Sequence, residues 1–281
     1  MVKFEVVDDR ALVELSERLV SVGGVVAVVL GGSRARGTHR PDSDFDLGLY
    51  YRGDLDVAAL RELAGREAEE PVEVTAPGGW GPWVDGGGWL TVQRWRVDWI
   101  YRDLDRVHRV WDECRAGRYE IGFQVGHPLG FYSHAYAGEV ALCRVLADPS
   151  GELAQLRART RRYPAALADA LVDRLWEADF ALRLAHYGAD GADPTYAAGC
   201  LFRAVGVACH ALHGRARQWL INEKGMVASA AGLSIAPPGF AEHAQRLLAD
   251  VGRSRPQIAQ TISHAHDLLA GVRAAVAYPP H

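Results

Sequence analysis

Apolar and polar positions follow one another along the chain in two different ways, and the change between them divides the sequence. Residues 25–30 read VVAVVL, a β-branched apolar run closed by two glycines, which predicts a buried strand. Residues 44–51 alternate with period two and place Asp44, Asp46 and Gly48 on one face, which predicts a second strand. The first part of the chain therefore has the patterning of a sheet.

Helices and further strands complete this first segment. Leucines at helical spacing within residues 8–22 predict a helix that a glycine pair ends, and residues 57–70 predict another. Residues 72–75 predict a brief strand, residues 77–88 a glycine-rich loop, and residues 89–101 a return to strand composition. The predicted order is helix, strand, strand, helix, strand, strand.

Strand signals nearly vanish after about residue 103, and stretches rich in alanine and leucine take over. Helices are predicted over residues 104–115, 134–147, 165–186, 196–213, 240–251 and 257–276, with proline and glycine breaks between them. We therefore predict an α+β protein with an N-terminal domain over 1–103 and an α-helical bundle domain over 104–281.

Composition places the chain among globular proteins. Of its 281 residues, 49% are hydrophobic and 23% charged, and no stretch approaches the roughly 18–20 uninterrupted apolar residues of a membrane span. The start, MVKFEVVDDR, lacks the order of a signal peptide, and the four cysteines form no Cys-x-x-Cys pair, so we expect a cytoplasmic protein with reduced thiols and no membrane partner. A net charge of −4 disfavours a dedicated nucleic-acid binder and slightly favours a neutral or cationic small substrate.

The loop between the first two strands carries the first candidate chemistry. Its glycine spacing is that of a P-loop, but Thr38 stands where that motif requires lysine, which argues against the nucleotide loop of an ATPase. Gly32 leaves backbone amides open and Ser33 adds a hydroxyl, and both groups suit a phosphate oxygen. Asp44 and Asp46 project from one face of the strand, as two carboxylates must to share hard divalent cations.

A third carboxylate stands in the strand predicted over residues 89–101. Asp98 is a lone acid among apolar and aromatic residues, and an ionised carboxylate there is costly unless it is paired or bound to metal. The sequence leaves two alternatives for Asp98, a metal ligand or a salt bridge to Arg96 or Arg102.

These three elements together resemble the DNA polymerase β-like nucleotidyltransferase superfamily. Its Gly-Ser pair, Asp-x-Asp motif and later third carboxylate match Gly32-Ser33, Asp44 and Asp46, and Asp98, in order and in predicted secondary structure, over about residues 10–103. The resemblance implies a small mixed sheet flanked by helices, two Mg²⁺ ions, and transfer of a nucleoside monophosphate from ATP or another NTP with release of pyrophosphate.

The predicted helical domain narrows the resemblance to one group of nucleotidyltransferases. A sheet domain followed by a helical bundle is similar to the antibiotic nucleotidyltransferases of the kanamycin and aminoglycoside type, which implies a small hydroxyl acceptor bound between the domains. The stretch LVDRLWEADFALR resembles the bundle helix that carries a general base in that group, which points to Glu177 and leaves Asp173, Asp179 and Glu139 as alternatives. Lys224 resembles a lysine that contacts the triphosphate, and Arg34, beside Ser33, is a further candidate for that contact.

Other functions stay open at this point. The acceptor can instead be a macromolecule, a protein hydroxyl or a tRNA end, for which the basic run over residues 156–162 is the one favourable feature. A non-catalytic, antitoxin-like binding module is a third alternative, although all three carboxylates are present. Five tryptophans could stack on a base or an acceptor ring, and the sequence does not select among them: Trp80, Trp83, Trp89, Trp95 and Trp99.

Overall fold

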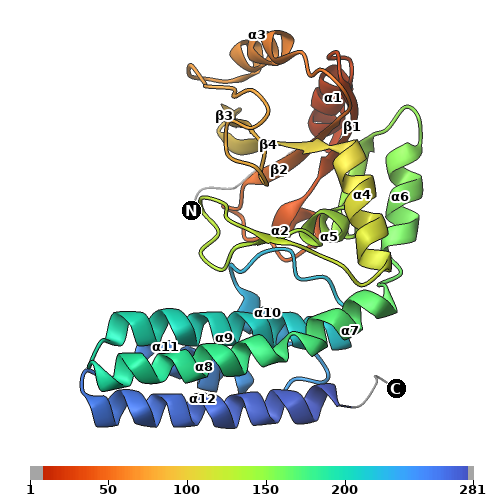
Figure 1. The fold of residues 1–281 in the computed structure, drawn as a ribbon. Coiled ribbons are helices and arrows are strands. Elements are labelled where there is room, and N and C mark those ends of the chain that lie inside the picture. The colour runs from red at the N-terminus through yellow and green to blue at the C-terminus, as the bar shows by residue number, and fades with distance from the viewer. Residues whose placement is uncertain (1–8, 278–281) are drawn as a thin grey trace. The chain divides into compact units, whose positions relative to one another are not determined.

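The structure is a computed structural model that describes residues 9–277 as two compact units (Figure 1). One unit, here called the sheet unit, comprises the described residues up to Asp112 together with Glu120–Arg162. The other, the helical unit, comprises Glu113–Tyr119 and the described residues from Tyr163 onward. Each unit is described by itself.

The sheet unit is built on a five-stranded mixed sheet with the strand order β3-β4-β2-β1-β7. Its strands are β1 (Val25–Leu30), β2 (Phe45–Tyr51), β3 (Gly87–Val92), β4 (Trp95–Asp103) and β7 (Arg144–Ala147). β2 and β4 are parallel, and each of the other neighbouring pairs is antiparallel. The α+β class predicted from the sequence is confirmed.

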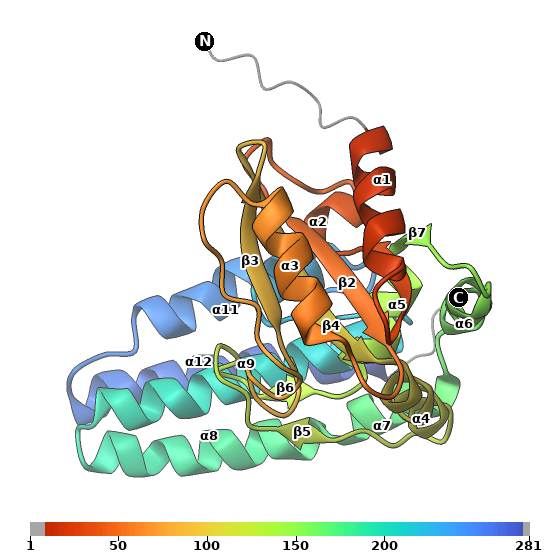
Figure 2. The same ribbon diagram turned by 90° about the horizontal axis from the view of Figure 1, so that it is seen from above.

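One face of this sheet is covered by α1 (Asp9–Val20) and α3 (Val57–Glu67) (Figure 2). The period of two predicted for β2 places Leu47 and Leu49 in the core beneath these helices, together with Trp99 of β4. The alternate residues of both strands face the other side of the sheet. That second face carries the predicted carboxylates, so the packing of α1 and α3 decides where the site lies.

Part of the sheet unit differs from the sequence prediction. Residues 134–147 were predicted as one helix, but α5 (Ala135–Leu142) ends at Cys143, and the chain continues as β7 beside β1. Pairing with the outer edge of β1 overrides the local helical preference of this stretch. The expected boundary at residue 103 consequently lies inside the sheet unit, which draws its fifth strand from beyond it.

The strand region around residue 93 folds as a hairpin. Gln93 and Arg94 both have positive φ, of 48° and 68°, and turn the chain between β3 and β4. The brief strand expected over 72–75 is reduced to an isolated bridge between Val74 and Gly88. The remaining elements of this part of the chain are α2 (Gly32–Ala35), α4 (Leu104–Arg115), β5 (Ile121–Gly122), β6 (Phe131–Tyr132) and α6 (Glu152–Thr160).

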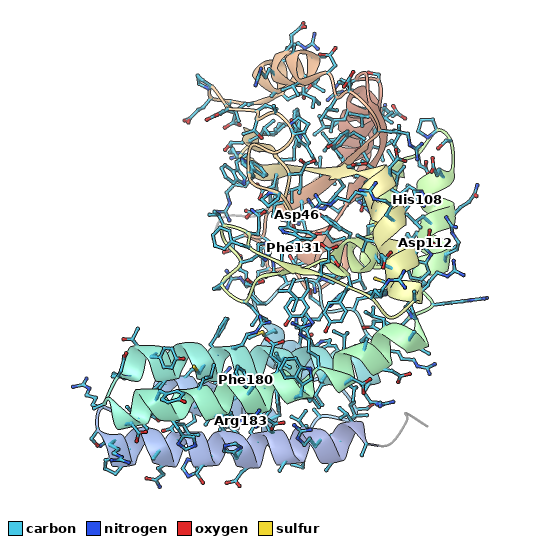
Figure 3. All side chains as sticks on the ribbon, viewed as in Figure 1. Asp46, His108, Asp112, Phe131, Phe180 and Arg183 are labelled. Carbon is cyan, nitrogen blue, oxygen red and sulfur yellow. The ribbon has the colours of Figure 1, made fainter. Side chains whose placement is uncertain are left out.

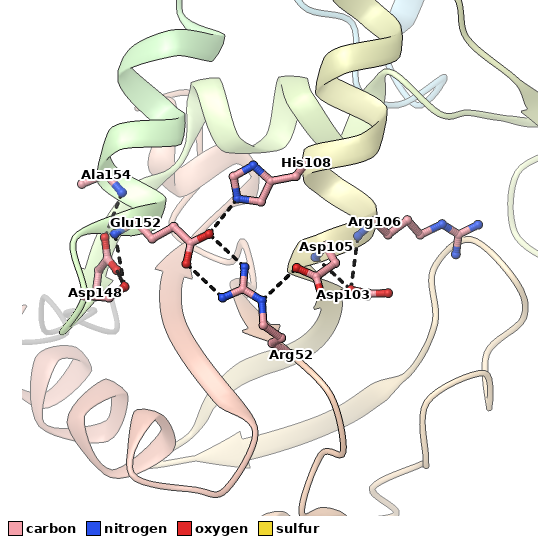
Figure 4. Close-up of polar contacts among 9 residues, drawn as sticks. Arg52, Asp103, Asp105, Arg106, His108, Asp148, Glu152 and Ala154 are labelled. Carbon is pink, nitrogen blue, oxygen red and sulfur yellow. Dashed lines mark hydrogen bonds and ion pairs between the residues drawn. The ribbon is translucent and has the colours of Figure 1, made fainter.

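A cluster of charged side chains at the end of β2 joins α4 to α6 (Figure 4). The Arg52 guanidinium donates from Nε to Oδ1 of Asp105 at 2.8 Å and from Nη2 to Oε1 of Glu152 at 2.9 Å. Nε2 of His108 lies 2.9 Å from the same Oε1. These groups are partly exposed, so they fix the relative position of the two helices more than they add to stability.

The helical unit contains six helices between residues 165 and 276. They are α7 (Ala165–Asp173), α8 (Leu175–Asp190), α9 (Pro194–Arg215), α10 (Met226–Ala231), α11 (Phe240–Ala249) and α12 (Arg255–Val276). The single helix predicted over 165–186 is divided at Arg174, whose ψ of −5° departs from the helical value. Among the described residues, one helix, α9, is long and apolar enough to cross a membrane, and 61% of its apolar window is buried, as in the core helix of a soluble protein.

Candidate active site

The loop that follows β1 lies directly against β2. The Gly31 amide donates to the carbonyl oxygen of Asp46 at 2.7 Å, which holds the loop backbone on the strand. Gly32 has a φ of +61°, and a Cβ placed on it would overlap Oδ2 of Asp46. Only glycine therefore allows the backbone of this loop to approach the Asp46 carboxylate, and Ser33 follows immediately in the one-turn helix α2.

Two of the predicted carboxylates are neighbours across the sheet. Asp46 of β2 is the register partner of Asp98 of β4, and partners in a parallel pair project from the same face (Figure 3 labels Asp46). Asp44 precedes Asp46 by two residues, just ahead of β2. Burial first, and then the charges of Asp46 and Asp44, raise the pKa of Asp98 to about 6, while Arg96 opposes the rise. The three carboxylates thus repel one another electrostatically at neutral pH.

The salt-bridge alternative for Asp98 does not match the observed contacts. Nε of Arg96 lies 2.5 Å from Oδ1 of Asp44, and Nε of Arg102 lies 2.6 Å from Oε2 of Glu139 in a pair whose arginine is buried. Within residues 9–277, neither arginine forms an ion pair with Asp98. Asp98 is left as a half-buried acid whose nearest charged neighbours include two other acids.

The donor set suits a hard divalent cation in chemical type, because carboxylate oxygens are the ligands that Mg²⁺ prefers. The side chains are not drawn together as a finished site: over the described part of the chain, no group of three or more His, Cys, Asp and Glu side chains is arranged to hold a metal ion. Asp44 is turned toward Arg96, although its Oδ1 is buried and accepts no hydrogen bond of normal geometry. Asp46 and Asp98 are the pair that register alone brings together.

Arg34 contacts the segment that leads into Asp44. Its guanidinium donates to the carbonyl oxygen of Ser43, from Nη2 at 2.7 Å and from Nε at 3.0 Å, and stacks 3.7 Å from the centre of the Phe45 ring. These contacts hold the chain just ahead of Asp44 in its conformation. The predicted contact between Arg34 and a triphosphate stays a prediction, and the observed role is to position the Asp44 segment.

The two other predicted residues belong to the helical unit. The Glu177 carboxylate on α8 is 15% exposed and is held on both oxygens, by Nε of Arg174 at 2.5 Å and by Nη2 of Arg203 at 2.5 Å. Lys224 is exposed in the turn before α10, where its backbone amide donates to Oδ1 of Asn222 at 2.7 Å. Their roles as general base and triphosphate ligand stay predictions.

One residue beside the carboxylates could not be selected from the sequence. Trp89 of β3 is the register partner of Asp98 across the β3–β4 pair, and the residue is 66% exposed. The sequence offered five tryptophans as candidates for stacking and did not distinguish among them. The alternation within residues 89–101 could not show which residue pairs with Asp98 on the neighbouring strand. Only the register of the hairpin identifies Trp89 as a neighbour of the site.

Comparison with known proteins agrees with the first part of this site. Residues 12–75 match the family model of the nucleotidyltransferase domain, a segment that includes Gly32, Ser33, Asp44 and Asp46 and ends before Asp98. Among solved structures, the chain is similar to a nucleotidyltransferase-like protein from Exiguobacterium sibiricum 255-15, at 10% identity and a TM-score of 0.47, over 95% of this chain and 77% of that one. No curated protein matches the sequence. The domain match supports nucleotidyl transfer as the general activity.

Proposed function

We propose that this protein transfers a nucleoside monophosphate, AMP in the first instance, from an NTP to a hydroxyl of a small polar acceptor such as an aminoglycoside-like antibiotic. The observation that carries the proposal is the row formed by Gly32, Asp46 and Asp98, in which the glycine loop lies against Asp46 and Asp46 stands in register with Asp98. The match of residues 12–75 to the nucleotidyltransferase domain supports the same chemistry.

The reaction needs one oxygen–phosphorus bond to form and one to break. The acceptor oxygen bonds to the α-phosphorus, the bond from that phosphorus to the α–β bridging oxygen breaks, and pyrophosphate leaves. The hydroxyl proton passes to a base, for which Glu177 is the proposed group. Asp44, Asp46 and Asp98 would hold two Mg²⁺ ions, which neutralise charge on the α-phosphate and the leaving group when bound.

The remaining residues bind and orient the nucleotide. In this proposal, the backbone amide of Gly32 and the hydroxyl of Ser33 donate hydrogen bonds to the triphosphate beside Asp46, and Lys224 supplies a positive charge for it. Arg34 holds the Asp44 segment through the Ser43 carbonyl, so its replacement acts on the carboxylate through the loop. Positioning of this kind carries much of the catalysis in phosphoryl transfer.

The experiment that tests the proposal measures transfer directly. Wild-type protein is incubated with each NTP, Mg²⁺ and a panel of aminoglycosides, lincosamides and tRNA, and the readouts are pyrophosphate release and an acceptor mass increased by one nucleoside monophosphate. We expect release with a cationic small acceptor and none with Asp46→Asn. Asp42→Asn is the matched control, because that exposed aspartate of the same loop pairs with Arg40.

Four outcomes separate the alternatives. Transfer to tRNA alone would replace the small acceptor by a nucleic acid, and absence of transfer to every acceptor would reject the substrate class. Equal binding of Mg²⁺ and ATP by wild type and Asp46→Asn, measured by isothermal titration, would reject the metal assignment. Tight ATP binding without any turnover would favour the non-catalytic module.

A further inference from the structure

An exposed pair of stacked tryptophans lies beside the carboxylates on the sheet. Trp89 projects from the same face as Asp98, since register partners in an antiparallel pair share a face. The indole rings of Trp80 and Trp89 stack with their centres 4.4 Å apart and their planes 14° from parallel. Trp89 stays 66% exposed in spite of this contact, so a large part of its ring faces solvent.

Trp80, the inner member of the pair, is held in place by contacts with neighbouring residues. The Trp80 amide donates to the Asp85 carbonyl oxygen at 3.0 Å, and the Trp80 carbonyl oxygen accepts from Nε2 of Gln124 at 2.6 Å. Trp80 also packs over Gly87, where a Cβ would lie 3.0 Å from the indole ring. An aromatic ring fixed in this way loses little conformational entropy when a ligand binds to it.

The order of the strands places the tryptophans on one side of the carboxylates and the phosphate loop on the other. Reading across β1, β2, β4 and β3, the row runs from the Gly31 amide to Asp46, Asp98 and Trp89. Neighbouring strands are about 4.8 Å apart, so Trp89 begins one strand beyond Asp98. A ring bound on Trp89 would thus lie within a few ångströms of the carboxylates.

The geometry of in-line displacement indicates on which side of the carboxylates the acceptor would bind. The attacking and leaving oxygens stand on opposite sides of the phosphorus. If the pyrophosphate leaves over the loop beside β1, as the proposed function requires, the acceptor oxygen approaches from the side of β4 and β3. That side is the one that Trp89 occupies.

We propose that Trp89, backed by Trp80, is the docking platform for the ring of the acceptor, and that the acceptor is a cationic, ring-containing polyol. This inference rests on the proposed function and names the chemistry of its second substrate. The C–H face of a saturated ring packs on an indole, an ammonium group is attracted to the indole face, and the neighbouring carboxylates favour a positive charge. The tryptophans take no part in the bond changes themselves.

The test uses equilibrium binding, which does not depend on turnover. Kanamycin, a cationic aminocyclitol, and a non-hydrolysable ATP analogue with Mg²⁺ are titrated separately into wild type, Trp89→Ala, Trp89→Phe and Thr91→Ala. Thr91→Ala is the matched control, an exposed position on the same face of β3. We expect Trp89→Ala to weaken kanamycin binding about tenfold or more, Trp89→Phe to stay within about threefold, and the nucleotide affinity to stay unchanged throughout.

Loss of nucleotide affinity in Trp89→Ala with kanamycin binding intact would overturn the inference and make the pair a nucleobase platform. Equal kanamycin affinity in wild type and Trp89→Ala, or absence of binding to wild type, would also overturn it. Trp89-dependent kanamycin binding without pyrophosphate release would reject the proposed transfer and uphold the platform. Trp89→Phe guards against misfolding, since it keeps an aromatic ring at the position.

Discussion

Replacing Asp98 by asparagine should make the metal-free protein more stable. The pKa of this half-buried acid is raised to about 6 by burial and by the charges of Asp46 and Asp44. Each tenfold change in a protonation equilibrium corresponds to about 1.4 kcal/mol, so an ionised Asp98 lowers the free energy of unfolding by at most about 3 kcal/mol at neutral pH. Asp98→Asn removes that charge and keeps the size of the side chain.

The sign of the pH dependence follows from the direction of the shift. Between about pH 4 and pH 6, Asp98 keeps its proton in the folded protein but has lost it in the unfolded chain. The free energy of unfolding of wild type therefore falls as the pH rises through that window. The variant should match wild type near pH 4 and exceed it by up to about 3 kcal/mol at pH 7.5.

Urea unfolding at both pH values, in EDTA and in millimolar Mg²⁺, measures the difference. Mg²⁺ should stabilise wild type and have little effect on the variant, because a ligand stabilises only the state that binds it. Asp42→Asn is the control for removal of an exposed carboxylate. A variant no more stable than wild type at pH 7.5 in EDTA would refute the reasoning.

Three further changes test other parts of the molecule. In turnover assays, Gly32→Ala should lower kcat more than about tenfold, because its Cβ displaces a carboxylate of β2. Gly37→Ala is the control and should not lower kcat, since Gly37 also has a positive φ but nothing lies near its Cβ. Arg102→Met should lower the free energy of unfolding by about 3–5 kcal/mol, and the double variant with Glu139→Met should recover most of it in urea titrations. Glu177→Gln should lower kcat about 100-fold or more with KM little changed if that residue is the base, and a change confined to stability would assign it to its arginine pair.

Local pattern was sufficient for much of the fold because its periods are strong. The apolar run of β1, the alternation of β2 and the helices predicted over 104–115, 196–213, 240–251 and 257–276 follow from residue spacing, and each appears near its predicted place. β7 could not be found in this way. Residues 144–147 read RVLA after a helical stretch, and their strand conformation comes from pairing with β1 more than one hundred residues away.

The candidate site likewise has features that local spacing predicts and features that depend on tertiary structure. Gly32, Asp44 and Asp46 lie within one loop and strand, so their spacing could indicate their chemistry. The neighbourhood of Asp46, Asp98 and Trp89 depends on which strands pair and in which register, and sequence periodicity contains neither. The Arg203 contact of Glu177 comes from the packing of α8 with α9, which helical spacing alone does not give.

The late arrival of β7 has a consequence for biosynthesis. Until residue 147 has been made, the VVAVVL strand is paired with β2 alone, and its outer side offers unsatisfied backbone groups to any other chain. A nascent protein halted between residues 103 and 147 would therefore be prone to aggregate through this edge. The five-stranded sheet is thus completed only when about half of the polypeptide has been synthesised.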